Sequence, residues 1–176
     1  IVAKKSIVHF DRDKNTGILT NQVNSYFDPN IQITDVKVSF DGKHVYVTTG
    51  VPSSIVYFDR DADSGNLTKK VELLQPGVLQ SMVVSSNGKH AYAVATIGNS
   101  VYKFDRNPET GNLTGPIKCN SNNLLVPTSI TISTDGKTVY AVFYVSHSIV
   151  HWDRNIDTGE ISLQDNININ SPKSIT

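Results

Sequence analysis

The chain contains four copies of one short motif, and this repetition limits what it can fold into more than any other feature. Each copy has an aromatic residue, the pair Asp-Arg and, five residues after the arginine, a glycine. The copies begin at Phe10, Phe58, Phe104 and Trp152. Successive motif arginines are 48, 46 and 48 residues apart. A period of this length is typical of β-propellers, in which each repeat forms one small sheet, or blade.

A second motif shares the period and predicts a hairpin inside each repeat. It reads Ser, any residue, Asp or Asn, then Gly-Lys, and its glycines are Gly42, Gly88 and Gly136. From each of these glycines to the next motif arginine is 18 residues. Asp-Gly and Asn-Gly between apolar stretches are signals of a type I′ hairpin turn.

The stretches between these turns are rich in β-branched and aromatic residues and predict four antiparallel strands per repeat. No stretch predicts a helix, so the predicted fold class is all-β, a single segment of four-stranded blades. Residues 21–33 are expected to form an irregular link. The expected divisions are a partial blade 1–33, blades 34–79, 80–126 and 127–171, and the start of a further blade at 172–176.

Bulk composition excludes some classes of partner. The sequence has 16 Lys and Arg residues against 16 Asp and Glu residues, and no basic stripe. This balance argues against nucleic acid as a partner. No apolar run is long enough to span a membrane, and the single cysteine, Cys119, excludes an internal disulfide framework.

The repeat resembles that of the lactonase-like β-propellers. The likeness lies in Ser-x-Asp-Gly-Lys-x-Val-Tyr-Val followed by Ser-Ile-Val-x-Phe-Asp-Arg-x-x-x-Thr-Gly-x-Leu-Thr, and it recurs along the whole chain. A weaker likeness, to WD repeats, rests on Trp152-Asp153. Rings of the lactonase-like group have about seven blades, so the resemblance implies an incomplete arc of such a ring. Similar repeats in large secreted or surface-attached proteins favour an extracellular or cell-surface location.

The resemblance also implies where an active site would lie. Lactonase-type enzymes carry His residues at the start of some innermost strands, seven positions before the hairpin glycine. The matching positions here are Asp35, Ser81 and Ser129, with Ser174 as a fourth, and none is His. The predicted function is therefore a nonenzymatic binding or scaffolding segment. The alternative is a lactone hydrolase of the 6-phosphogluconolactonase-like type.

The turn after each aromatic residue suggests a metal site. Its Asp and Asn residues alternate as the oxygen ligands of calcium loops do, but no carboxylate follows to close the loop. Local turn hydrogen bonds are the competing interpretation. Calcium is the one cofactor considered, with calcium-dependent adhesion as a second alternative function. The candidate ligands are Asp11, Asp13, Asn15, Asp59, Asp61 and Asp63.

Residues without counterparts in other repeats suggest a binding surface, because loops on a rigid scaffold often carry function. Tyr26 and Asp28 are expected in the link between the first two blades, and Tyr144 and His147 in a loop of the last. Together with Asp35, Ser81 and Ser129 they are the predicted ligand-binding residues.

The expected partners follow from the open arc. Its terminal blades would expose apolar faces and strand edges, so we expect further blades of the same protein, neighbouring copies or other proteins to cover them. A four-bladed ring with a defective seam is the alternative. The Asp-Arg pair, present in every copy, is expected to tie blades together by hydrogen bonds or a salt bridge.

Overall fold

The computed structural model describes residues 2–3, 5–75, 77–170 and 172–175, and every regular element within them is a β-strand. The strands form four antiparallel sheets, one for each copy of the motif, which we call blades 1 to 4. Consecutive strands of a blade are hydrogen-bonded neighbours. The all-β prediction is therefore confirmed, and blades 2 to 4 have the predicted four strands. The described residues contain no helix that is long and apolar enough to cross a membrane.

The strand bounds follow the repeat. Blade 1 consists of β1 (Val2–Ala3), β2 (Ser6–Arg12) and β3 (Leu19–Phe27). Blade 2 consists of β4 (Ile33–Val38), β5 (His44–Thr49), β6 (Ser54–Arg60) and β7 (Leu67–Leu74). Blade 3 consists of β8 (Leu79–Val84), β9 (His90–Ala95), β10 (Ser100–Arg106) and β11 (Leu113–Cys119). Blade 4 consists of β12 (Pro127–Ile132), β13 (Thr138–Phe143), β14 (Ser148–Arg154) and β15 (Ile161–Asn168).

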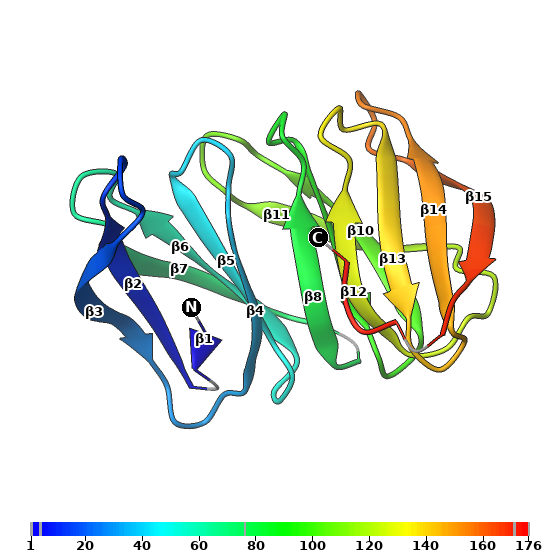
Figure 1. Ribbon diagram of the computed structural model, residues 1–176, viewed down its shortest axis with the longest axis horizontal. Helices are drawn as coiled ribbons and strands as arrows, with labels where there is room; N and C mark the ends of the chain where they lie inside the picture. The colour runs from blue at the N-terminus through cyan, green and yellow to red at the C-terminus, as the bar shows by residue number, and fades with distance from the viewer. Residues whose placement is uncertain (1, 4, 76, 171, 176) are drawn as a thin grey trace.

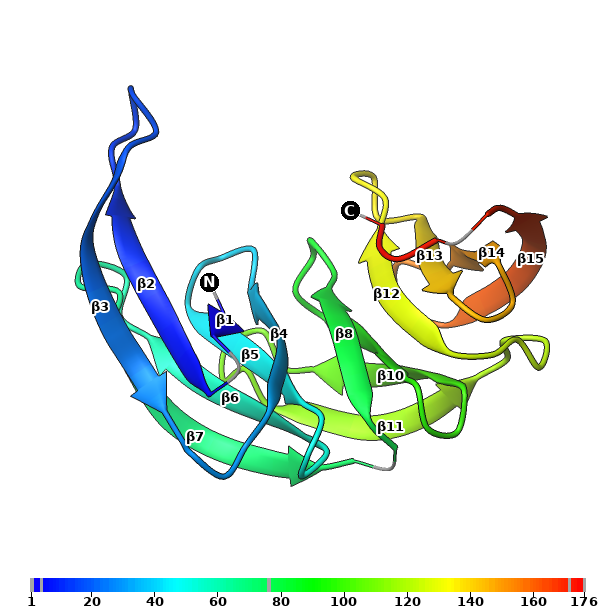
Figure 2. The same cartoon turned by 60° about the horizontal axis from the view of Figure 1, so that its bottom comes forward.

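The blades stand side by side in an arc (Figures 1 and 2). The first strands of blades 2 to 4 line its inner side, where β4 contacts β8 and β8 contacts β12. The last strands, β7, β11 and β15, form the opposite edges of their sheets. Radial packing of sheets in this way is the architecture of a β-propeller, of which this chain forms part.

The hydrophobic core lies between blades rather than within them. Blades 2 and 3 bury a shared cluster that includes Tyr46, Tyr57, Leu79, Met82 and Phe104. A similar cluster between blades 3 and 4 is centred on the fully buried Trp152. Burying one such large side chain contributes about 1.5–3 kcal/mol. Since each cluster needs two sheets, a blade depends on its neighbours for stability.

An arginine at the end of β10 fastens blade 3 to blade 2. Nε of Arg106 donates to the hydroxyl of Tyr46 at 2.5 Å, and Nη2 lies 2.8 Å from Nδ1 of His44. Nη1 donates to the carbonyl of Gly88 at 2.7 Å, and Tyr46 donates in turn to the carbonyl of Gly111 at 2.7 Å. We call this buried arrangement the arginine clasp.

The same clasp joins blade 4 to blade 3. Arg154 contacts the Tyr92 hydroxyl and His90 Nδ1, each at 2.8 Å, and donates to the carbonyl of Gly136 at 2.7 Å. Tyr92 donates to the carbonyl of Gly159 at 2.5 Å. The expectation that the repeated arginine ties blades together is therefore confirmed at these two seams.

The aspartate of the Asp-Arg pair has a different role, because it bonds within its own blade. Asp11 accepts from Asn21 Nδ2 at 2.8 Å, and Asp59 lies 2.8 Å from Nζ of Lys70. The aspartate therefore links β2 to β3 in blade 1 and β6 to β7 in blade 2.

The motif glycine is required for two reasons at the clasped seams. Gly111 and Gly159 have φ angles of 74° and 70°, in the left-handed region that favours glycine. A Cβ on Gly111 would also overlap the ring of His44, and one on Gly159 would overlap the ring of His90. Gly17, at the equivalent position of blade 1, has a φ of 74° and no such ring within contact.

Two local predictions are wrong. The hairpin at Asp41-Gly42 is not type I′, because only the glycine has a positive φ; it is a four-residue loop closed by bonds between Ser39 and His44. Residues 21–27 are not an irregular link but belong to β3, which pairs with β2. Residues 172–175 lie beside β12 without a regular strand, and their assignment to the start of a further blade stays a prediction.

We predict that Gly111→Ala destabilises the fold more than Gly17→Ala does. Both changes carry the cost of a left-handed alanine, about 1–2 kcal/mol, but only the first forces the His44 ring from its place. The further cost of such overpacking is about 1–3 kcal/mol. Urea unfolding of both variants measures the difference, and equal losses would contradict the proposed contact.

We also predict that stability falls as pH decreases from about 6.5 to 4. Burial, and after it the charge of Arg154, lowers the pKa of His90 to about 4. Unfolded His90 takes up a proton near pH 6.5 while the folded residue stays neutral, so acid favours unfolding in this window. NMR titration of His90 should show a neutral ring at pH 5.5. His90→Gln, which keeps an acceptor but cannot titrate, should flatten the pH dependence; an unchanged dependence would refute this origin.

Candidate functional site

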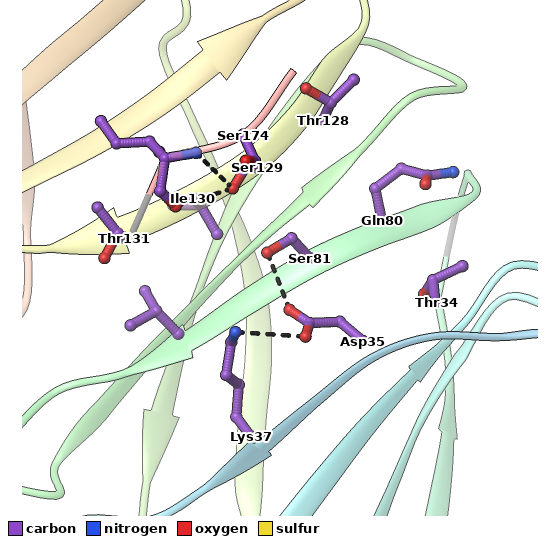
Figure 3. A pocket seen from close by; sticks show the side chains of 12 residues that line it. Thr34, Asp35, Lys37, Gln80, Ser81, Thr128, Ser129, Ile130, Thr131 and Ser174 are labelled. Carbon is purple, nitrogen blue, oxygen red and sulfur yellow. Dashed lines mark hydrogen bonds and ion pairs between the residues drawn. The ribbon is translucent and has the colours of Figure 1, made fainter. Parts of the chain in front are cut away.

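The inner strands border a hollow of about 460 Å³ that brings together the equivalent positions of successive blades (Figure 3). Asp35 of β4, Ser81 of β8, Ser129 of β12 and Ser174 all line it. These are the four innermost-strand positions singled out from the sequence. Their grouping follows from the repeat, because the same position in each blade faces the same side of the arc.

Asp35 connects β4 to β8. One carboxylate oxygen accepts from the Ser81 hydroxyl at 2.9 Å and from the backbone N–H of Met82 at 3.1 Å. The other accepts from the N–H of Val36 at 2.8 Å and lies 3.3 Å from Nζ of Lys37. Both oxygens are thus occupied, so Asp35 is held in one orientation and holds its neighbours in turn.

Lys37 is the one cationic side chain among the described residues that line the hollow. Its side chain is 38% exposed, against 18% for Asp35, so the ammonium remains accessible to a ligand. Sequence reasoning missed this residue. A signal was available, because side chains two apart in a strand share a face, which places Lys37 beside Asp35.

Hydroxyl groups make up most of the remaining polar lining. The Ser129 hydroxyl is engaged with Ile175, accepting from its N–H at 3.2 Å and lying 3.1 Å from its carbonyl. Ser174 is exposed at the same edge. The hydroxyl-bearing residues of the lining are Thr34, Ser81, Thr128, Ser129, Thr131 and Ser174. One ammonium among many hydroxyls suits a polyhydroxylated ligand with a negative charge.

Tyr26 and Asp28 do not line this hollow. Tyr26 belongs to β3 rather than to a loop, and its ring packs edge-on against Phe58 with centroids 5.0 Å apart. Its hydroxyl donates to Asp28 at 3.4 Å, and Nζ of Lys69 lies 5.8 Å from its ring centroid. Burial raises the pKa of the Tyr26 hydroxyl. Tyr26 therefore packs between blades 1 and 2, and placing it in a loop was wrong.

Tyr144 and His147 lie in the turn between β13 and β14, as expected, and also apart from the hollow. Tyr144 is exposed, and His147 borders a separate depression with Asn168 and Asn170. Their role in binding stays a prediction.

The candidate calcium turns use their oxygens locally. Oδ1 of Asp61 accepts from the backbone N–H and the hydroxyl of Ser64, both at 2.7 Å, and Asp13 does the same for Thr16. Asp63 is exposed in the same turn. Among the described residues, no three His, Cys, Asp or Glu side chains form a group that could hold a metal ion. Calcium binding stays a prediction, and this geometry favours the turn interpretation.

Asparagine fills the same place in the other two blades. Oδ1 of Asn107 and of Asn155 accepts from the backbone N–H groups two and three residues later, at 2.9 and 3.0 Å. A neutral amide therefore closes this turn as a carboxylate does.

Comparison with protein families identifies a match along the chain. A family model described as "Lactonase, 7-bladed beta-propeller" matches residues 3–115 and 80–176. A comparison with curated proteins found no match.

Solved structures with the same architecture cover nearly all of the chain. A protein from Bacteroides uniformis, described as a candidate 6-phosphogluconolactonase, has a TM-score of 0.82 at 21% identity, over 96% of this chain and 50% of that one. The periplasmic gluconolactonase PpgL of Pseudomonas aeruginosa has a TM-score of 0.74 at 18% identity, over 88% and 45%. A chain of a nidogen–laminin complex has a TM-score of 0.71 at 13% identity, over 97% and 62%. At these identities the likeness shows the fold alone, and this chain spans about half the length of the first two.

We predict that Asp61→Asn leaves stability within about 0.5 kcal/mol of the original, because asparagine makes the same turn bonds in blades 3 and 4. Asp61→Ala should cost about 1 kcal/mol by removing the acceptor. Urea unfolding measures both. Calorimetric titration with calcium of the original and of Asp59→Asn combined with Asp61→Asn tests the metal prediction. Calcium binding by the original protein that is lost in the double variant would support the metal prediction. Absence of binding heat in the titration of the original protein would reject it.

Proposed function

Because this chain belongs to the lactonase family of seven-bladed β-propellers, we propose that the protein containing it is a hydrolase that opens lactone rings. This is the alternative drawn from the sequence, and it replaces the nonenzymatic segment as the preferred function. The observation that carries it is the family match along the chain, joined to a hollow built from equivalent inner-strand positions. The relatives named as gluconolactonases suggest the substrate class, a cyclic ester of a sugar acid.

The lining of the hollow supports this substrate class. A sugar lactone carries several hydroxyl groups, which hydrogen-bond well to the serine and threonine hydroxyls of β4, β8 and β12. Lys37 supplies the positive charge that a phosphorylated or otherwise anionic sugar requires. Close pairing with Asp35 fixes the direction of the ammonium.

Lys37 also suits the chemistry of the reaction. Attack of water on a lactone carbonyl places negative charge on the carbonyl oxygen, and a fixed cation beside that oxygen lowers the barrier. Asp35 acts as a positioning residue in this scheme, because Ser81, Met82, Val36 and Lys37 occupy both of its oxygens. The group that removes the proton from water would belong to another part of the ring.

A second candidate is the binding or scaffolding function predicted from the sequence. It is favoured by the bonds of Asp35, which tie β4 to β8, and of Ser129, which tie β12 to Ile175; these bonds are sufficient to explain both residues structurally. The fold shared with a chain of the nidogen–laminin complex is compatible with such a use.

We predict that the full-length protein hydrolyses glucono-δ-lactone, its 6-phosphate or both, and that Lys37→Met lowers kcat/KM about 10²-fold, as loss of one oxyanion partner does. Proton release at constant pH measures the reaction. A rise in KM confined to the phosphorylated lactone would instead place the phosphate, not the carbonyl, at Lys37.

The matched control is Lys14→Met, which removes the same charge from an exposed turn of blade 1. Its kcat/KM should equal that of the original protein. A folded full-length protein that turns over no member of a lactone panel would overturn the hydrolase proposal and leave the binding candidate.

A further inference from the structure

The innermost strand of each of blades 2 to 4 contains a β-bulge at the same position of the repeat. Ile33 and Asp35 of β4 pair with successive residues of β5, which leaves Thr34 as the extra residue. Gln80 is the extra residue of β8, and Thr128 is that of β12. A bulge re-aims the side chain of its extra residue out of the regular alternation. Two consecutive side chains of each strand therefore line the hollow.

The bulge of blade 3 differs from the other two. The hydroxyl of Thr34 is hydrogen-bonded to that of Thr48 at 2.9 Å. The hydroxyl of Thr128 donates to the carbonyl of Lys173 at 3.0 Å. In blade 3 the place of Thr48 is taken by Val94, a fully buried apolar side chain. Both threonine hydroxyls are therefore used within the protein, whereas the bulge residue of blade 3 has no hydroxyl partner on the next strand.

Gln80 keeps its hydrogen-bonding groups available to a ligand. Its side chain is half-buried at the hollow, and its amide forms no hydrogen bond with any residue that the structure describes (Figure 3). The amide has two N–H donors and a carbonyl acceptor. Two neighbouring hydroxyl groups of a sugar match this set, since one accepts from an N–H while the other donates to the carbonyl.

Gln80 and Lys37 lie apart, with the bridge between blades 2 and 3 between them. In Figure 3 they are on opposite sides of the bonded pair Asp35 and Ser81. Because the oxygens of Asp35 and the hydroxyl hydrogen of Ser81 are already engaged, a ligand that spans the pair meets an ammonium on one side and an amide on the other. This suits a molecule with a negative charge at one end and hydroxyl groups further along.

We propose that Gln80 is a specificity-determining residue, which binds the hydroxyl groups of a polyhydroxylated acid or lactone whose charged or carbonyl end lies at Lys37. The choice of a sugar-acid derivative rests on the proposed function, whereas the match between an amide and neighbouring hydroxyl groups does not. Gln80 breaks no bond in this scheme and selects the ligand by its hydroxyl groups. Thr34 and Thr128 do not duplicate this role, because their hydroxyls are bonded within the protein.

Calorimetric titration of the full-length protein with gluconate and with hexanoate tests this role. The two anions have the same length of carbon chain and the same carboxylate, but only gluconate carries further hydroxyl groups. Gln80→Leu keeps most of the bulk and removes the amide. It should weaken gluconate binding about 10-fold, as loss of one or two neutral hydrogen bonds does, and leave the weaker binding of hexanoate unchanged. Lys37→Met should weaken the binding of both anions.

The matched control is Gln22→Leu, which removes the same amide from an exposed position of β3 and should leave both affinities unchanged. If Gln80→Leu does not fold by circular dichroism, Gln80→Thr replaces it, since blades 2 and 4 have threonine at this position. An original protein that binds no gluconate, or a Gln80 variant that binds it as tightly as the original, would overturn the inference.

Lactone hydrolysis by the same variants separates this inference from the proposed function. Gluconate binding that depends on Gln80, in a protein that turns over no lactone, would support the inference and overturn the hydrolase proposal. Hydrolysis of glucono-δ-lactone with a KM that Gln80→Leu leaves unchanged would do the reverse.

Discussion

The contact on which the arc depends is the bond set between one arginine and the preceding blade. Its guanidinium has three nitrogens, and at each clasped seam all three are engaged, with a hydroxyl, an imidazole and a carbonyl. A buried guanidinium is costly unless its donors are paired, so the clasp fixes where one blade sits on the next. The apolar clusters supply most of the favourable free energy, and the clasp restricts them to one arrangement.

Much of the fold could be predicted from the repeat, because the order of the strands and the number of blades follow from a sequence motif that recurs four times. Local geometry was less predictable. The Asp41-Gly42 pair indicates a turn, but the turn type depends on whether Asp41 itself adopts a positive φ, which it does not. β3 extends to Phe27 because packing of Tyr26 on Phe58 outweighs the weak strand propensity of residues 21–25.

The hollow was partly visible in the sequence for the same reason. Residues at the same position of each repeat face the same side of the arc, which predicts that Asp35, Ser81 and Ser129 lie near one another. All three line the hollow. The clasp histidines and tyrosines were not found, because their partners lie about 60 residues further along the chain. No spacing within one repeat indicates which blade an arginine will reach.

Lys37 breaks the symmetry of the arc. At the equivalent positions of the next two blades stand Val83 and Thr131, so only one blade of the three places an ammonium in the hollow. A set of similar blades offers a small ligand several nearly equivalent orientations, each related to the next by a rotation about the central axis. For a ligand bound as proposed, the single charge of Lys37 would make one of these orientations lower in energy than the rest, and the hollow would then distinguish the two ends of that ligand.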